Sequence, residues 1–68
     1  MSDDYDYRTY PRGEEPDVEV EVEGQWHPGD LQAWTKRDGS WWAHVVYSTG
    51  PAQTYRSIIP AERVRPAT

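Results

Sequence analysis

The chain has 68 residues, a formal net charge of −5 and no cysteine, which allows one small domain and excludes a disulfide framework and thiolate chemistry. The charge is uneven, because residues 1–25 hold nine acidic and two basic side chains whereas residues 26–68 hold three and five. This acidic balance disfavours non-specific binding to nucleic acid. No stretch is apolar enough for a signal peptide or a membrane span, so the expected location is cytoplasmic.

Residues 1–16 form a segment rich in acidic residues and tyrosine, with two prolines and no aliphatic side chain after the initial methionine. This composition is typical of a disordered tail. Its tyrosines, Tyr5, Tyr7 and Tyr10, have two interpretations: an aromatic recognition motif or lid, or part of a solvated tail, and the composition favours the second. We therefore expect a disordered acidic tail over residues 1–16 and a folded domain over residues 17–68.

The first strand pattern covers residues 17–23, where valine and acidic residues alternate without a fault. Such alternation predicts a half-buried strand with the valines on the buried face. Pro28 and Gly29 then supply turn chemistry. A second strand is expected over residues 31–36, and simple alternation divides its side chains between two faces. One face would carry Leu31, Ala33 and Thr35, and the other Gln32, Trp34 and Lys36.

The dipeptide Asp38-Gly39 is the strongest hairpin signal in the chain. It leads into a third strand over residues 40–48, in which one face would carry Trp41, Ala43, Val45 and Tyr47 and the other Trp42, His44 and Val46. A fourth strand is expected over residues 53–59. Residues 60–63 are expected to form one helical turn before a short closing strand. The chain is therefore predicted to be all-β, a small five-stranded antiparallel barrel.

Four tryptophans lie between residues 26 and 42, in a chain without phenylalanine and with few aliphatic side chains. A domain this small needs large apolar side chains for its core, so we expect the core to be aromatic. A barrel of this size cannot easily enclose four indoles, which predicts that one or two remain on the surface. The alternative interpretation is that all four belong to the core or its edge.

This order of strands and turns resembles the SH3-like barrels, and within them the Tudor and agenet type. The resemblance covers roughly residues 17–66. It is carried by Gly29-Asp30, Ala33-Trp34, Asp38-Gly39, the run Trp41-x-Ala43-x-Val45, and the exit Pro60-Ala61-Glu62-Arg63-Val64-Arg65-Pro66. In such domains an aromatic cage takes up methylated lysine or arginine, so the resemblance implies cage-like positions for Trp34 and Trp41. The loop over residues 48–51 offers no acidic or Asn side chain to orient a cation.

The residues themselves predict an aromatic groove. Trp34 and Trp41 are expected to line it together with Tyr47 or Tyr55, while Trp42 belongs to the other face and is more buried. Flat amphipathic rings suit a peptide, a polyproline segment or a methylated side chain equally well, and the ligand stays open at this point.

Basic residues offer a second hypothesis, an anion or nucleic-acid face formed by Lys36, Arg37 and Arg56 beside the rings. The simpler interpretation of these cations is ordinary solvated charge, and scattered positions favour it. His27 and His44 have no spacing that predicts a metal site. No residue combination predicts a catalytic site or a cofactor.

The function expected from the sequence is therefore a monomeric, non-catalytic interaction module that binds a protein or peptide segment through an aromatic groove. The runner-up is a small nucleic-acid-associated barrel that uses an arginine and aromatic face, with the acidic tail as competitor. A third interpretation is a small acidic accessory protein that acts only within a larger assembly. Salt dependence separates the first two, because phosphate binding falls steeply with ionic strength.

Overall fold

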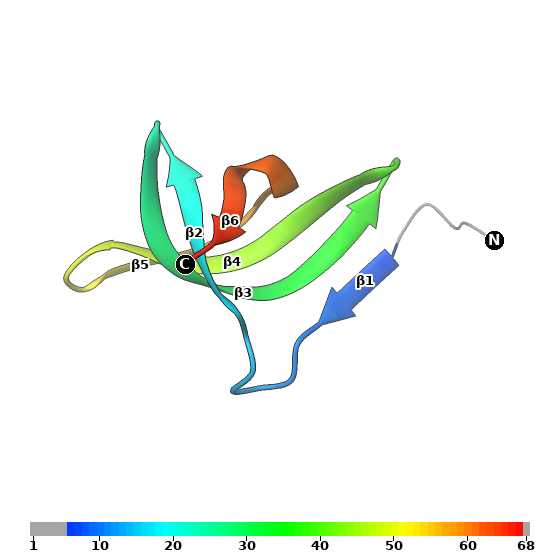
Figure 1. Cartoon of the computed structure of the whole chain (residues 1–68), viewed down its shortest axis with the longest axis horizontal. Coiled ribbons are helices and arrows are strands. Elements are labelled where there is room, and N and C mark those ends of the chain that lie inside the picture. The colour runs from blue at the N-terminus through cyan, green and yellow to red at the C-terminus, as the bar shows by residue number, and fades with distance from the viewer. Residues whose placement is uncertain (1–5, 68) are drawn as a thin grey trace.

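A computed structural model describes residues 6–67 of the chain as six strands and one short 3-10 helix (Figure 1). In chain order these are β1 (Asp6–Thr9), β2 (Asp17–Val22), β3 (Gln25–Arg37), β4 (Ser40–Gly50), β5 (Gln53–Pro60), η1 (Ala61–Arg63) and β6 (Val64–Pro66). The expected hairpin at Asp38-Gly39 is confirmed, with both residues at positive φ, as a two-residue type I′ turn requires. In this part of the chain no helix is long and apolar enough to cross a membrane.

The strands form one antiparallel sheet in the order β5-β4-β3-β2-β6, which confirms the all-β prediction. The sheet is not closed, and it has six strands where five were expected. β3 is the longest strand and is shared, because its residues 25–30 pair with β2 and its residues 33–36 pair with β1. Figure 1 shows β3 as a bent strand, with η1 and β6 inside the bend.

The sixth strand, β1, lies in the segment that composition predicted to be disordered. It pairs with β3 from Asp6 opposite Lys36 to Thr9 opposite Ala33. The physical reason is that β3 runs beyond the end of β2 and leaves backbone groups free, and strand pairing uses the backbone rather than apolar side chains. A disordered tail over residues 1–16 is therefore not confirmed. Residues 1–5, with Tyr5, lie outside the described residues.

A small aliphatic cluster forms the core. Its buried members are Val18, Val20, Leu31, Ala43, Val45 and Ile59. The expectation of an aromatic core was wrong, because all four tryptophans are only half-buried. An indole is too large to be enclosed by a sheet of this size, and Trp34 is the tryptophan that packs against the cluster from outside. The buried valine face predicted for β2 is confirmed. For β4 the sequence did not decide which face is buried; Ala43 and Val45 are buried, whereas Trp42, expected to be more buried than Trp41, is half-buried as Trp41 is. We call the face that carries this cluster the core face and the opposite one the outer face.

β3 contains a β-bulge that reverses the predicted assignment of its faces. Leu31 pairs with Val45 on the core face, but Ala33 pairs with His44, and Gln32 is the extra residue between them. Directly opposite residues in a ladder point to the same side of the sheet. Leu31 and Ala33 therefore lie on opposite faces, although simple alternation had placed them together.

The bulge moves every following side chain of β3 to the other face. Trp34 pairs with Ala43 and so lies on the core face, while Thr35 pairs with Trp42 and lies on the outer face. The alternation rule failed here because a bulge sets two residues against one, and a one-residue shift exchanges the faces.

Candidate functional site

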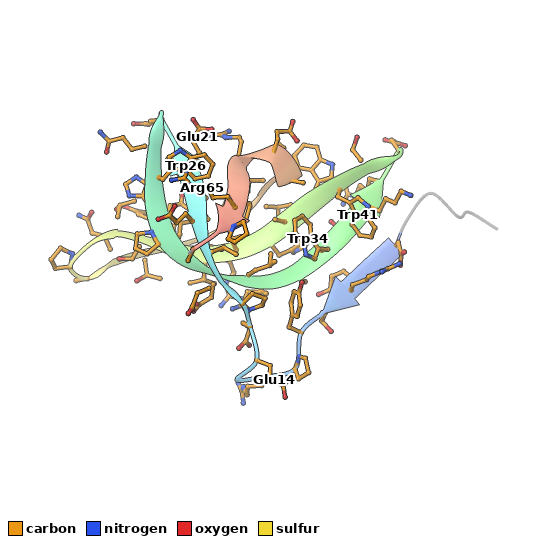
Figure 2. The ribbon with its side chains drawn as sticks, viewed as in Figure 1. Glu14, Glu21, Trp26, Trp34, Trp41 and Arg65 are labelled. Atoms are coloured by element: carbon orange, nitrogen blue, oxygen red, sulfur yellow. The ribbon has the colours of Figure 1, made fainter. Side chains whose placement is uncertain are left out.

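Trp34 and Trp41 come together on the core face, near the Asp38-Gly39 turn of the β3–β4 hairpin. Trp34 is opposite Ala43 and Trp41 is opposite Lys36, so the two indoles are diagonal neighbours across the ladder. Their ring centroids are 6.3 Å apart and the planes meet at 85°, an edge-to-face contact. Figure 2 labels both side chains near the end of the hairpin. The two aromatic residues predicted to share a surface do share one.

Tyr10, which follows β1, completes this aromatic surface. Its hydroxyl oxygen accepts a hydrogen bond from the Trp34 Nε1–H at 3.2 Å. The Tyr10 ring packs against the core, and its backbone N–H donates to the Gln32 carbonyl at the bulge, with an N···O distance of 3.4 Å. Tyr10 was considered for an aromatic recognition motif or lid, but composition favoured a solvated tail, and its contact with Trp34 was not predicted from the sequence.

The three rings line an open hollow of about 550 Å³, which we call the aromatic hollow. Its lining consists of Arg8, Thr9, Tyr10, Trp34, Trp41 and Ala61. Three of these six residues come from β1 and the residue that follows it. The site therefore depends on the N-terminal segment, which the sequence placed outside the folded domain.

Two cationic groups lie over the Trp41 ring. The Arg8 guanidinium carbon is 5.3 Å from the ring centroid and the Lys36 Nζ is 5.8 Å from it. Both distances are within the range of cation–π attraction. Because Trp41 already has two cationic neighbours, a further cation in the aromatic hollow meets like charge. The arrangement is thus poorly suited to a methylated lysine or arginine.

Tyr47 and Tyr55 lie in a different place. They are opposite one another on β4 and β5 with ring centroids 5.6 Å apart, and the His27 ring is 6.4 Å from Tyr47. All three side chains line a separate hollow with Gln25. Tyr47 is six positions along the extended strand from Trp41, roughly 20 Å. The predicted groove of four aromatic residues is therefore divided between two sites.

The three cations predicted to form an anion-binding face are also divided. Lys36 lies on the core face beside Trp41. Arg37 follows Lys36 and lies on the outer face, and Arg56, opposite Val46, lies there as well. Successive strand residues alternate between faces, so Lys36 and Arg37 cannot serve one surface.

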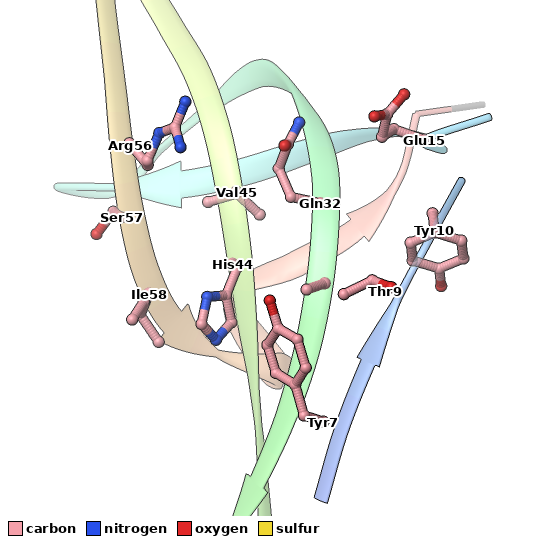
Figure 3. A pocket seen from close by; sticks show the side chains of 11 residues that line it. Tyr7, Thr9, Tyr10, Glu15, Gln32, His44, Val45, Arg56, Ser57 and Ile58 are labelled. Carbon is pink, nitrogen blue, oxygen red and sulfur yellow. The ribbon is translucent and has the colours of Figure 1, made fainter. Parts of the chain in front are cut away.

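A hollow of about 700 Å³ lies on the outer face (Figure 3). Figure 3 shows His44 between Ile58 and Tyr7. The Tyr7 ring meets His44 edge-on at a centroid distance of 5.8 Å, and the His44 Nε2 is 3.1 Å from the Oγ1 of buried Thr35. These contacts hold β1, β3 and β4 together, so His44 has a structural explanation.

Trp26 has a structural partner of its own. The Arg65 guanidinium carbon lies 3.9 Å from the Trp26 ring centroid, and its Nε donates to Glu19 at 2.7 Å. Figure 2 shows Trp26 and Arg65 together at β2, away from Trp34 and Trp41. Arg63 donates to the Glu21 carbonyl at 3.0 Å. These contacts attach β6 to the sheet and account for Trp26 without a ligand.

Comparisons with family models, curated proteins and solved structures yielded no match to the chain. The arrangement of its side chains is therefore the basis for a functional assignment.

Among residues 6–67 no group of three or more His, Asp or Glu side chains could hold a metal ion. One carboxyl group is perturbed. The pKa of Asp30 is raised above its ordinary value of 3.8, first because partial desolvation penalises the charged form and second because Asp17 lies opposite, although the residue itself is exposed. Asp30 lies outside the aromatic hollow, so this shift bears on stability rather than on the site.

Proposed function

We propose that this protein is a non-catalytic interaction module that binds a short protein segment in the aromatic hollow. The observation that carries the proposal is the convergence of Tyr10, Trp34 and Trp41 on one open depression. Large rigid rings next to a few polar groups are the usual composition of peptide-binding surfaces. An apolar or proline side chain of the ligand would lie in the hollow against the exposed faces of the rings.

The fold supports this proposal at the level of architecture. We propose that the fold is a variant of the SH3-like barrel of the Tudor type, in which the strand pairing does not close the barrel. The supporting features are the bent β3 shared between two partners, the single 3-10 turn, and the return of β6 to pair with β2. Fold alone does not assign a ligand, so the chemistry of the hollow decides it.

A nucleic-acid-associated barrel is the second candidate, because Arg8 and Lys36 flank an indole on which a base could stack. Two observations make it the weaker one. Arg37 and Arg56 lie on the outer face, and the whole chain carries a net charge of −5. Phosphate contacts would therefore be few.

Selection from a displayed library of random dodecapeptides tests the proposal. The full chain and a Trp41→Ala variant serve as bait and counter-bait, and enriched peptides are synthesised and titrated into the ¹⁵N-labelled wild type. We expect the indole N–H resonances of Trp34 and Trp41 to shift. The resonance of Trp42, which follows Trp41 in β4 but lies on the outer face, should stay in place. Because the shifts are read on the wild type, unfolding of the variant would not obscure the result.

Two outcomes would overturn the proposal. One is a selection in which no peptide is enriched over Trp41→Ala, and the other is a set of peptides that shift Trp42 and leave Trp34 in place. An oligonucleotide of eight deoxythymidines, titrated at 50 and 500 mM salt, tests the second candidate. Tight binding that disappears at the higher salt would favour nucleic acid.

A further inference from the structure

Arg8 lines the aromatic hollow, and Lys36, on the neighbouring strand, lies over the Trp41 ring at the edge of the hollow. Arg8 is opposite Trp34 in the β1–β3 ladder, and Lys36 is opposite Trp41 in the β3–β4 ladder. Directly opposite residues share a face, so both cations lie on the side of the sheet that carries the two indoles. A ligand in the hollow would therefore have Arg8 beside it and Lys36 close by at the Trp41 ring.

The chain already supplies a carboxylate to this place. Asp6 is opposite Lys36, and its Oδ2 is 3.3 Å from an Arg8 guanidinium nitrogen. The Arg8 and Asp6 side chains are 68% and 47% exposed. Ion pairs this open to water contribute little, so a carboxylate from a partner can replace Asp6 at small cost.

We propose, on the basis of the function proposed above, that the aromatic hollow selects protein segments with an aspartate or glutamate next to the apolar anchor. Arg8 and Lys36 determine this specificity by facing the ligand carboxylate. Asp6 acts as an internal competitor that pairs with Arg8 when the hollow is empty. Charge complementarity makes the partner an acidic segment, and a segment centred on methylated lysine is rejected by the same two cations.

The test compares two forms of each selected peptide, one with its acidic residues and one with Asn and Gln in their place. We expect the acidic form to bind the full chain about threefold to fivefold more tightly at 20 mM salt. This ratio should approach one at 500 mM salt, because exposed charges are screened. Lys36→Gln should lower the ratio and Asp6→Asn should raise it. Arg56→Gln, a cation on the outer face, is the matched control and should leave the ratio as in the wild type.

The outcomes separate this inference from the proposed function. Equal affinities of the acidic and amide peptides, with the Trp34 and Trp41 indoles still shifting, overturn the inference and leave peptide binding intact. A lower ratio in Asp6→Asn overturns the role of Asp6 as competitor. An Arg56→Gln effect as large as that of Lys36→Gln would show that net charge, rather than the aromatic hollow, selects the acidic form.

Discussion

Replacing Gly29 with alanine tests how tightly β3 packs against β4 at this position. Gly29 is opposite Tyr47 on the core face, and a Cβ placed on it would lie 2.7 Å from the Val46 carbonyl oxygen and 3.0 Å from the Tyr47 Cβ. These atoms belong to the backbone or adjoin it, so they cannot rotate away. Overpacking of this kind costs about 1–3 kcal/mol. A domain this small is stabilised by roughly 3–5 kcal/mol, so the loss would be a large share.

Urea unfolding followed by tryptophan fluorescence measures this loss. Gly50→Ala is the matched control, because a Cβ at Gly50 would meet only the Gln53 Oε1 at 3.7 Å, an ordinary contact. Gly-to-Ala exchanges without strain stabilise by about 0.4–1 kcal/mol through the unfolded chain. We expect Gly50→Ala to be at least as stable as the wild type and Gly29→Ala to be clearly less stable. Equal midpoints for the two variants would refute the packing argument at Gly29.

Three further predictions concern the core, β1 and pH. Val20→Asp places a charge at a fully buried position at a cost of several kcal/mol, so circular dichroism should show an unfolded chain. Deleting residues 1–10 removes β1 and the Tyr10 contact and should lower the melting temperature by roughly 4–8 °C per kcal/mol lost, whereas an unchanged melt would contradict the pairing. The raised pKa of Asp30 means that its ionised form costs stability above that pKa. Asp30→Asn should therefore raise the melting temperature at pH 7, by a small amount because the residue is exposed, and not at pH 3. Equal gains at both pH values would count against a penalty on the ionised form from desolvation and from Asp17.

Local sequence signals predicted the strands of the folded region in part, because Pro28 and Gly29, expected in a turn, lie inside β3. Valine alternation placed Val18 and Val20 in the core, and Asp38-Gly39 fixed the hairpin, because a strand's two-residue period and a type I′ turn are local properties. The strand β1 could not be predicted in the same way. It is held by the edge of β3 that β2 leaves unpaired. That free edge exists only because β2 is shorter than β3 and pairs with residues 25–30 alone.

The candidate site was predicted only in part, because part of it depends on contacts between distant segments of the chain. Trp34 and Trp41 were expected on one surface, and they are, but Tyr47 and Tyr55 belong to another hollow. The rise per residue of an extended strand is enough to separate Tyr47 from Trp41, so this division follows from sequence distance alone. Tyr10 was named as a possible lid, but its contact with Trp34 could not be predicted because it depends on the pairing of β1 with β3.

The contact between the Trp34 and Trp41 rings depends on the β-bulge in β3, which was not predicted from the sequence. Without the bulge at Gln32, Trp34 would keep the simple alternation of β3 and point to the outer face, while Trp41 would stay on the core face. The carbonyl of Gln32 accepts the Tyr10 backbone N–H, so the same irregularity also attaches the third ring. One extra residue thus brings the three rings to one surface. Bulges commonly redirect side chains next to functional sites, and here that redirection creates the aromatic hollow on which the proposed function rests.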